Sequence, residues 1–426
     1  MSLISKDRQF IWHPFTPQKD MTEPIGVTHA KGSLLFDENG NTYIGAISSW
    51  WVNIHGHAHP YIAEKIYRQA LQLEHIIFAG FTHAPAVELA GKLLDILPQN
   101  FSRVFYSDDG STSVEVAIKM ALQYWWNLRE SQTSNVKSET RKKILAFNNS
   151  YHGDTFGAMS VSDRSVFTLA FHDLLFEVIF VDVPSEENIA AIKNIIDQYE
   201  DDIGAFIYEP LVQGAGGMKM YNAVLLDELL YHIKQKKIIC IADEVMTGFG
   251  RTGKMFGSEY MQTKPDIVCL SKGLTGGTMA LGVTACSEEI YQAYVSKDVH
   301  KTFFHGHSFT ANPLACSAAL ASLELFNTEN TLEKITWITE QNIAFARQLR
   351  ELNGIKNVRA LGTILAFEIT QGKDEYLNNI SQAITKKCLA EGVYIRPLGN
   401  TMYIMPPYCI TQQELQKIYA VVCKVI

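Results

Sequence analysis

The sequence predicts an α/β protein, with a mostly parallel sheet in a large domain and a smaller α+β domain beside it. Short apolar runs rich in Val, Ile, Phe and Ala recur through the middle of the chain and alternate with longer helical patterns. This alternation is typical of a parallel sheet covered on both faces. The chain of 426 residues is also longer than one ordinary domain. Its two ends do not follow the alternation, which indicates the second domain.

The expected strands follow one another in chain order. In the large domain they are residues 104–107, 144–147, 178–181, 205–209, 238–242 and 267–270, with 283–287 as a further strand at an edge. Residues 361–369 and 401–404 are expected strands of the smaller domain. A ligand site in such a sheet lies along the carboxyl ends of the parallel strands.

The domain boundaries follow from where the alternation holds. We expect residues 55–326 to form the large domain, which would carry the cofactor. Residues 1–54 and 327–426 would form the small domain together, with the N-terminal segment packed against the C-terminal one.

Composition and charge exclude several classes of protein. A hydrophobic content of 47% and a charged content of 19% are typical of a globular enzyme. The net charge of −8 leaves no broad basic surface, so we expect no nucleic-acid partner. Seven scattered cysteines without a C-x-x-C pair indicate a reducing cytoplasm. No signal-peptide core and no apolar run of membrane-spanning length is seen, so a cytoplasmic protein without a membrane partner is expected.

Two charged residues follow neighbouring apolar runs, at positions where burial is costly. Asp243 comes after the run 238–242 and Lys272 comes after 266–270. A lysine held among Ser and Gly can lose its proton and act as an amine nucleophile, and a buried carboxylate can keep a heteroaromatic nitrogen protonated. The pair predicts pyridoxal phosphate (PLP), with Lys272 as the Schiff-base lysine and Asp243 as the partner of the pyridine nitrogen. The alternatives are a helix cap for Asp243 and a solvated loop lysine for Lys272.

The segment 107–113, SDDGSTS, leads from an expected strand into an amphipathic helix. Gly110 lets the backbone turn closely, and Ser111 begins a helix whose free N–H groups can bind a phosphate. Ordinary Ser/Thr capping is the alternative. Neither a G-x-G-x-x-G nor a G-K-[ST] motif is present, so a nucleotide site is not favoured.

Three further side chains are expected to wall this pocket. Tyr151 could stack on the cofactor ring. If the chain stays extended beyond Asp243, Val245 shares its face and packs on the opposite side of the ring. Glu209 ends another apolar run and is either a polar wall or a buried structural carboxylate.

Two histidine groups are the candidates for a metal site. They are His55, His57 and His59, and then His305 and His307. Gly56 and Pro60 indicate a turn rather than a strand, and no carboxylate or cysteine lies nearby in sequence. We therefore expect no metal.

These pieces, in this order, resemble the class III (ω-amino acid) aminotransferases of the type I PLP fold. The resemblance spans residues 11 to about 408, and its most specific stretches are IWHPF, SSWWVNIHGHAHP, SRVFYSDDGS, YHGDTFGAMSV, QGAGGM, DEVMTGFGRTGKMF, HGHSF and IRPLG. It implies transamination with ping-pong kinetics on small molecules. It also implies a homodimer whose active sites lie at the interface.

By this resemblance the site residues divide into three groups. The catalytic residues are Lys272, Asp243 and Tyr151. The cofactor would be held by Gly110, Ser111, Tyr151, Asp243, Val245 and Lys272, with His307 and Ser308 reaching its phosphate from the other subunit. The substrate would be held by Phe15, Trp50, Trp51, Asp154, Arg251, Gly306, Arg396 and Tyr403.

Two positions depart from the family pattern. Phe15 replaces the usual tyrosine, and His307 replaces a common proline. HPF and HGHS resemble the branch that takes lysine as amino donor, whereas SSWW resembles the branch that uses S-adenosylmethionine. The competing functions are a class III enzyme for another ω-amino acid or diamine, an aminomutase, and a PLP-binding regulator.

Overall fold

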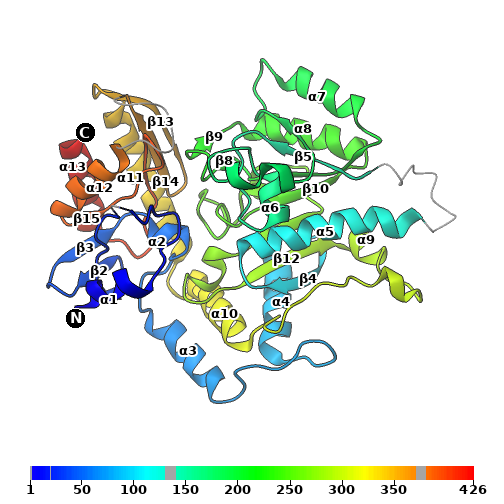
Figure 1. Ribbon diagram of the computed structural model, residues 1–426, viewed down its shortest axis with the longest axis horizontal. Coiled ribbons are helices and arrows are strands. Elements are labelled where there is room, and N and C mark those ends of the chain that lie inside the picture. The colour runs from blue at the N-terminus through cyan, green and yellow to red at the C-terminus, as the bar shows by residue number, and fades with distance from the viewer. Residues whose placement is uncertain (1, 20, 130–140, 371–379) are drawn as a thin grey trace.

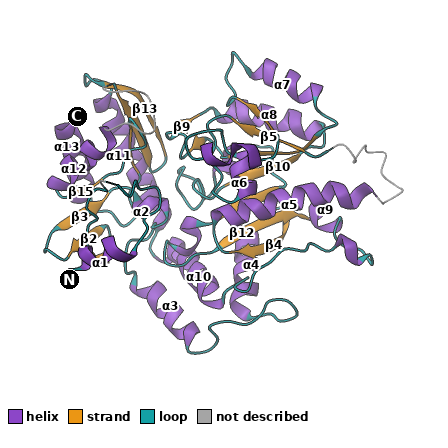
Figure 2. Cartoon of the chain, viewed as in Figure 1, coloured by secondary structure: helices purple, strands orange, loops and turns teal. Residues whose placement is uncertain are grey.

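The computed structural model describes residues 2–19, 21–129, 141–370 and 380–426. The described chain forms a large lobe around a seven-stranded sheet and a smaller lobe that contains both termini (Figure 1). Helices surround the strands of both lobes (Figure 2).

The central sheet has the strand order β4-β12-β11-β10-β7-β5-β6. Its strands are β4 (Phe101–Ser107), β5 (Lys143–Phe147), β6 (Val178–Val181), β7 (Ile203–Tyr208), β10 (Ile239–Asp243), β11 (Ile267–Leu270) and β12 (Gly282–Ser287). β12 is antiparallel to both neighbours, and the pairs from β11 to β6 are parallel. The predicted mostly parallel sheet is confirmed.

The prediction that residues 283–287 form an edge strand is wrong. β12 pairs with β11 on one side and with β4 on the other, and all of its residues are buried. The short local apolar run is the same for an inner and an edge strand, so it could not distinguish the two positions.

Helices cover both faces of the sheet. Alternate residues of β10 belong to different apolar clusters: Ile239 and Ile241 pack with one, Cys240 and Ala242 with the other. This is the two-residue period of a strand buried on both faces. The first cluster includes α5 (Gly110–Arg129), α6 (Phe156–Val161) and α9 (Glu288–Gln292). The second includes α4 (Ala84–Ile96), α7 (Ile189–Gln198), α8 (Ala223–Gln235) and α10 (Pro313–Thr328), and α3 (Pro60–Ala70) packs on α10.

The small lobe joins the two ends of the chain through backbone pairing. One sheet has the order β1-β2-β3-β15, in which β15 pairs in parallel with β3, Val393 opposite Ile44. Its strands are β1 (Val27–Lys31), β2 (Leu34–Asp37), β3 (Thr42–Gly45) and β15 (Val393–Tyr394). The N-terminal segment is therefore paired with the C-terminal one, while the exact boundaries at 55 and 327 stay a prediction.

The second sheet of the small lobe is antiparallel, in the order β13-β14-β16. Its strands are β13 (Ile355–Leu361), β14 (Ile364–Ile369) and β16 (Thr401–Ile404). The predicted strand 361–369 is divided by a turn at Gly362. That glycine has φ +57°, and a Cβ there would lie 2.2 Å from the carbonyl carbon of Thr252, so only glycine fits.

The remaining elements are short or lie at the ends. They are α1 (Leu3–Phe10), α2 (Ser48–Trp51), β8 (Val212–Gln213), β9 (Lys219–Met220), α11 (Thr331–Leu349), α12 (Ile380–Ala390), α13 (Gln412–Val425), and the 3₁₀ turns η1 (Leu169–Leu174), η2 (Gly257–Tyr260), η3 (Lys272–Thr275) and η4 (Val299–Lys301). Among the described helices, none combines the length and the apolar character needed to cross a membrane.

Candidate active site

The carboxyl ends of β10 and β11 open onto a cavity of about 140 Å³, called the inner cavity below. β10 ends with Asp243, and Lys272 follows β11 after Ser271. The cavity is lined by Trp51, Asp109, Gly110, Ser111, Tyr151, His152, Gly153, Glu209, Asp243, Val245, Met246 and Lys272. The structure therefore brings together the strand-end charges and the helix start that the sequence singled out.

Lys272 is held in an unusual environment. Its Nζ lies 4.6 Å from the ring centroid of Trp51. Burial lowers the pKa of the amine to about 8, against the opposing effect of Asp243 and Glu209. Its backbone has φ +47°, a left-handed conformation that is strained for a side chain of this kind and that is found at functional sites. The neutral form of the amine is thus well populated at pH values around 8, far below the ordinary pKa of 10.5.

Asp243 is fixed by a buried histidine that the sequence prediction missed. His152 Nδ1 lies 2.7 Å from Asp243 Oδ2, and the other carboxylate oxygen accepts the Val245 N–H at 3.0 Å. Both side chains are buried. The only signal in the sequence was the position of His152 next to Tyr151, because the two partners are 91 residues apart.

Glu209 both supports the pocket and lines it. Its carboxylate accepts the Tyr151 N–H at 3.1 Å and the Gly214 N–H at 2.8 Å. Burial raises its pKa to about 7. Glu209 therefore fits both interpretations that the sequence left open: it is a polar wall of the pocket and a buried structural carboxylate.

The start of α5 forms another side of the cavity. Asp109 Oδ1 accepts the Thr112 N–H at 2.8 Å, and Ser111 Oγ accepts the Asp154 N–H at 3.1 Å. A Cβ on Gly110 would lie 2.6 Å from Val245 Cγ1. The absence of a side chain at Gly110 therefore keeps this wall close to the helix start.

The chain does not stay extended beyond Asp243, so the condition under which Val245 would share the face of Asp243 is not met. β10 ends at Asp243, and residues 245–250 form turns. Val245 still lines the cavity with Tyr151, but it does so from a turn whose N–H is anchored on the Asp243 carboxylate.

Most of the residues predicted for the substrate contact one another or Tyr151. Arg396 sits over the Trp50 ring, with 4.8 Å from its guanidinium carbon to the ring centroid, and Phe15 meets Trp50 edge-on at 5.3 Å. Trp51 Nε1 donates to the Tyr403 hydroxyl at 3.0 Å. The Tyr151 hydroxyl donates to Asp154 Oδ2 at 2.9 Å, which turns that side chain toward the pocket.

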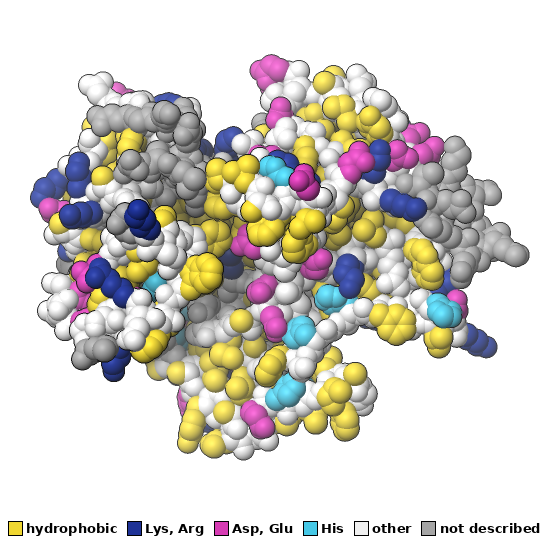
Figure 3. Space-filling view, in the orientation of Figure 1, with side chains coloured by type: hydrophobic (Ala, Val, Ile, Leu, Met, Phe, Trp, Pro, Cys, Tyr) yellow, Lys and Arg dark blue, Asp and Glu magenta, His cyan; other side chains and the backbone are white. Residues whose placement is uncertain are grey.

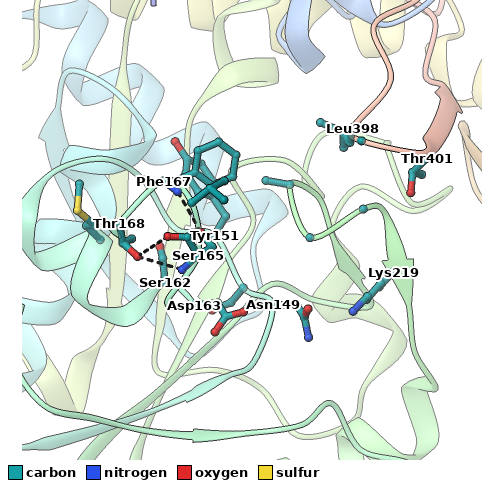
Figure 4. A pocket seen from close by; sticks show the side chains of 18 of the residues that line it. Asn149, Tyr151, Ser162, Asp163, Ser165, Phe167, Thr168, Lys219, Leu398 and Thr401 are labelled. Carbon is teal, nitrogen blue, oxygen red and sulfur yellow. Dashed lines mark hydrogen bonds between the residues drawn. The ribbon is translucent and has the colours of Figure 1, made fainter. Parts of the chain in front are cut away.

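A larger outer cavity of about 580 Å³ adjoins the inner one (Figure 4). The two cavities share Tyr151 and Gly153. The outer cavity is lined from the large lobe by residues such as Asn149 and Asp163, and from the small lobe by Leu398 and Thr401. The surface is hollowed between the two lobes (Figure 3).

Eight predicted residues line neither of these two cavities within the single chain. They are Phe15, Trp50, Arg251, Gly306, His307, Ser308, Arg396 and Tyr403. The fully buried Arg251 donates to the carbonyls of Trp51 and Pro406, behind the inner wall. Its Nε finds no hydrogen-bond partner in the part of the chain that the structure describes, and its charge helps to lower the pKa of Lys272.

The histidines of the two sequence clusters have separate partners. His55 contacts Ser322 Oγ, His59 contacts Glu329, His305 contacts Lys119, and His307 lies 3.4 Å from Asp108. Across residues 2–19, 21–129, 141–370 and 380–426, no group of three His, Cys, Asp or Glu side chains could hold a metal ion.

Comparison with known proteins shows which family the chain resembles. The family model described as aminotransferase class-III matches residues 15–426. The chain is 45% identical to the adenosylmethionine-8-amino-7-oxononanoate aminotransferase of Synechococcus elongatus, over 98% of both chains. The crystal structure of the enzyme of the same name from Methanocaldococcus jannaschii superposes with a TM-score of 0.94 at 35% identity, covering 100% of this chain and 98% of the other. An amine transaminase from an uncultivated Pseudomonas species, solved in its PLP-bound form, gives a TM-score of 0.89 at 28% identity over 98% of both chains.

Proposed function

The chain belongs to the class III aminotransferases, and from this we propose that it converts 8-amino-7-oxononanoate to 7,8-diaminononanoate, a step of biotin synthesis, with S-adenosylmethionine as amino donor. The full-length similarity to relatives that carry this activity in their names supports the choice of substrates. The single observation that carries the chemistry is the half-buried Lys272, whose amine has a lowered pKa, in the same cavity as the buried Asp243.

The residues present fit pyridoxal phosphate. The inner cavity offers the amine of the half-buried Lys272, a buried carboxylate at Asp243 and the start of a long helix at Gly110. A Cβ on Gly153 would lie 2.3 Å from Ser111 Oγ, so this glycine keeps the cradle narrow at its phosphate end. When bound, the cofactor supplies an electron sink for the charge left on the substrate carbon after its proton is removed.

The side chains of the inner cavity have distinct proposed tasks. Lys272 would hold the cofactor aldehyde and, once released, would take and return the proton at the substrate carbon, for which a pKa near the working pH is favourable. Asp243, oriented by His152, would keep the pyridine nitrogen protonated. Tyr151 would pack on the ring. Gly110 and Ser111 would hold the phosphate at the start of α5.

The outer residues would hold the substrate. Phe15 and Trp50 offer apolar surface for a carbon chain, and the guanidinium of Arg396 over Trp50 suits a carboxylate. Lysine is the second candidate for amino donor, because HPF and HGHS resemble the branch of the family that takes lysine.

We also propose a cytoplasmic homodimer. His307 and Ser308 would reach the phosphate of the partner subunit, which agrees with their position outside both cavities of their own chain. All seven cysteines are free thiols, which suits a reducing compartment.

Absorption spectroscopy of the purified protein tests the proposed function. We expect a visible PLP band that bleaches when S-adenosylmethionine is added and returns when 8-amino-7-oxononanoate follows. L-Lysine added separately tests the second donor, and Lys272→Ala is the control that should give no bleaching. A wild-type protein that shows no band after incubation with PLP would contradict the proposal.

A further inference from the structure

The inner and outer cavities differ in what they can hold. Sites for small molecules typically measure about 300–1,000 Å³. The outer cavity, about 580 Å³, lies within this range, while the inner cavity, about 140 Å³, lies below it. A substrate whose amine reaches Lys272 and whose carbon chain is too long for the inner cavity must therefore extend past Tyr151 and Gly153, the residues that both cavities share.

Phe167 stands at this passage. Its ring meets Tyr151 at 6.0 Å and Phe15 at 5.9 Å between centroids, both edge-on, and it lines the outer cavity. Figure 4 shows Phe167 next to Tyr151, with Asn149 and Lys219 farther along the cavity. Phe167 thus continues the aromatic row that begins with Trp50 and Phe15 and ends at Tyr151.

The loop that carries Phe167 is anchored on both sides. The next residue, Thr168, is 2% exposed; its Oγ1 accepts the Ser165 N–H at 3.0 Å and contacts His172 Nε2 at 2.8 Å. Arg164 donates to the carbonyls of Ser160 and Ser162, at 2.9 and 3.1 Å. The Phe167 ring is therefore presented by a braced loop, as a residue that selects substrates requires.

We propose that Phe167 is a specificity-determining residue, whose ring packs on the carbon chain of the substrate beyond the reacting amine. Its position favours long apolar chains, because only these extend from the inner cavity past Tyr151. A short amine ends before Phe167 and gains nothing from it. The inference rests on the proposed transamination at Lys272, and no cofactor atom is needed for the contact.

The test compares chain lengths. Wild type, Phe167→Ala and Phe167→Leu would be assayed with a series of unbranched ω-amino carboxylates from 4-aminobutanoate to 9-aminononanoate. We expect Phe167→Ala to lower kcat/KM for the longest members by about 10- to 100-fold, mainly through KM, and to leave the shortest within about twofold. Phe167→Leu restores most of the loss because it restores apolar surface.

Phe171→Ala is the matched control. Phe171 lies in η1, packs on Phe156 at 5.7 Å and is not among the residues that line the outer cavity. We expect it to leave the chain-length profile unchanged. An equal loss for short and long substrates in Phe167→Ala, or no loss at all, would overturn the proposal.

The two proposals fail in different ways. The proposed function is contradicted if wild type takes an amino group from no member of the series and transfers none to 8-amino-7-oxononanoate. Calorimetric affinities of wild type and Phe167→Ala for the same unreacted series then decide on Phe167: a loss of affinity that grows with chain length supports it, and a uniform or absent loss overturns it.

Discussion

At Lys272, the chemistry of a single amine is set by its surroundings. Burial removes hydration from the charged form, and the nearby charges of Asp243 and Glu209 restore only part of the lost stability. The buried Arg251, whose nearest hydrogen-bond partners are backbone carbonyls, adds a further unfavourable positive charge. The result is an amine that can be neutral or charged within the pH range of ordinary enzyme assays.

This pKa predicts how the stability of the apoprotein changes with pH. The ordinary pKa of 10.5 falls to about 8 in the folded state. Between these pH values the unfolded chain binds a proton that the folded chain does not, so the contribution of Lys272 to stability rises as pH increases through this window. Relative to Lys272→Met, the free energy of unfolding of wild type should rise by about 3 kcal/mol from pH 8 to above pH 10.

Urea unfolding at a series of pH values measures this difference. Lys31→Met is the control, because Lys31 is exposed and its amine stays hydrated in both states. The control should show a difference that does not change with pH. A flat difference for Lys272→Met as well would refute the lowered pKa.

The site residues differ in how visible they were in the sequence. Lys272 and Asp243 could be predicted because a charge at the end of an apolar run is a local signal. His152 could not, because its role depends on an approach to Asp243 that only the folded sheet creates. The hydrogen bonds of Arg251, a predicted substrate residue, to the carbonyls of Trp51 and Pro406 were equally invisible in the sequence, because they join distant segments.

At the scale of single elements, α2 is built in an unusual way. Its four residues, Ser48–Trp51, all have positive φ, at 48°, 47°, 65° and 75°. A left-handed turn costs about 1–2 kcal/mol per ordinary residue. The small lobe opposes this strain, since Ser48 Oγ donates to the Met405 carbonyl and Trp51 Nε1 donates to the Tyr403 hydroxyl. The strained turn thereby fixes the tryptophans that wall the site.

Glycine in this turn should relieve part of the strain. Ser49 is exposed and its hydroxyl contacts His57 Nε2. Ser49→Gly and Ser49→Ala both lose that contact, but only glycine adopts φ +47° freely. We expect Ser49→Gly to be more stable than Ser49→Ala by about 1 kcal/mol in urea unfolding. Equal stability of the two variants would show that the turn is not strained.

A second prediction concerns Gly110, at the start of α5. In Gly110→Ala the new methyl group would meet Val245 Cγ1 at 2.6 Å and push the wall away from the helix start. We expect the Kd for PLP to rise by about tenfold, measured by titration of the apoprotein, and Val245→Ala in the same chain to restore much of the affinity. Gly91→Ala is the control, because a Cβ at that position in α4 meets nothing within 4 Å.

The strands show which features of the sheet local sequence can predict and which it cannot. Parallel strands such as β6 and β11 were predicted with their ends in place, because their apolar runs stop at charged or turn residues. The inner position of β12 was not, because strand order depends on which edges meet in space. The turn at Gly362 was missed because its cause is the approach of the Thr252 backbone, far away in sequence.

At the scale of the whole molecule, the proposed dimer has a consequence that no single chain can show. If His307 and Ser308 complete the site of the partner subunit, each active site uses Lys272 from one chain and Ser308 from the other. Lys272→Ala removes the amine, and Ser308→Asp places a carboxylate where the cofactor phosphate would be. Each variant alone should then be inactive.

Mixed dimers of these two variants separate shared sites from independent ones. In a shared arrangement, one site of the mixed dimer carries both defects, and the other combines an intact Lys272 with an intact Ser308. Unfolding and refolding an equimolar mixture should therefore recover about a quarter of wild-type activity, since about half of the dimers are mixed and each has one intact site. If each chain builds its own site, every site in the mixture carries one defect and no activity returns. Sedimentation of the refolded mixture checks that dimers have formed, so that absent activity argues against the shared site and not against refolding.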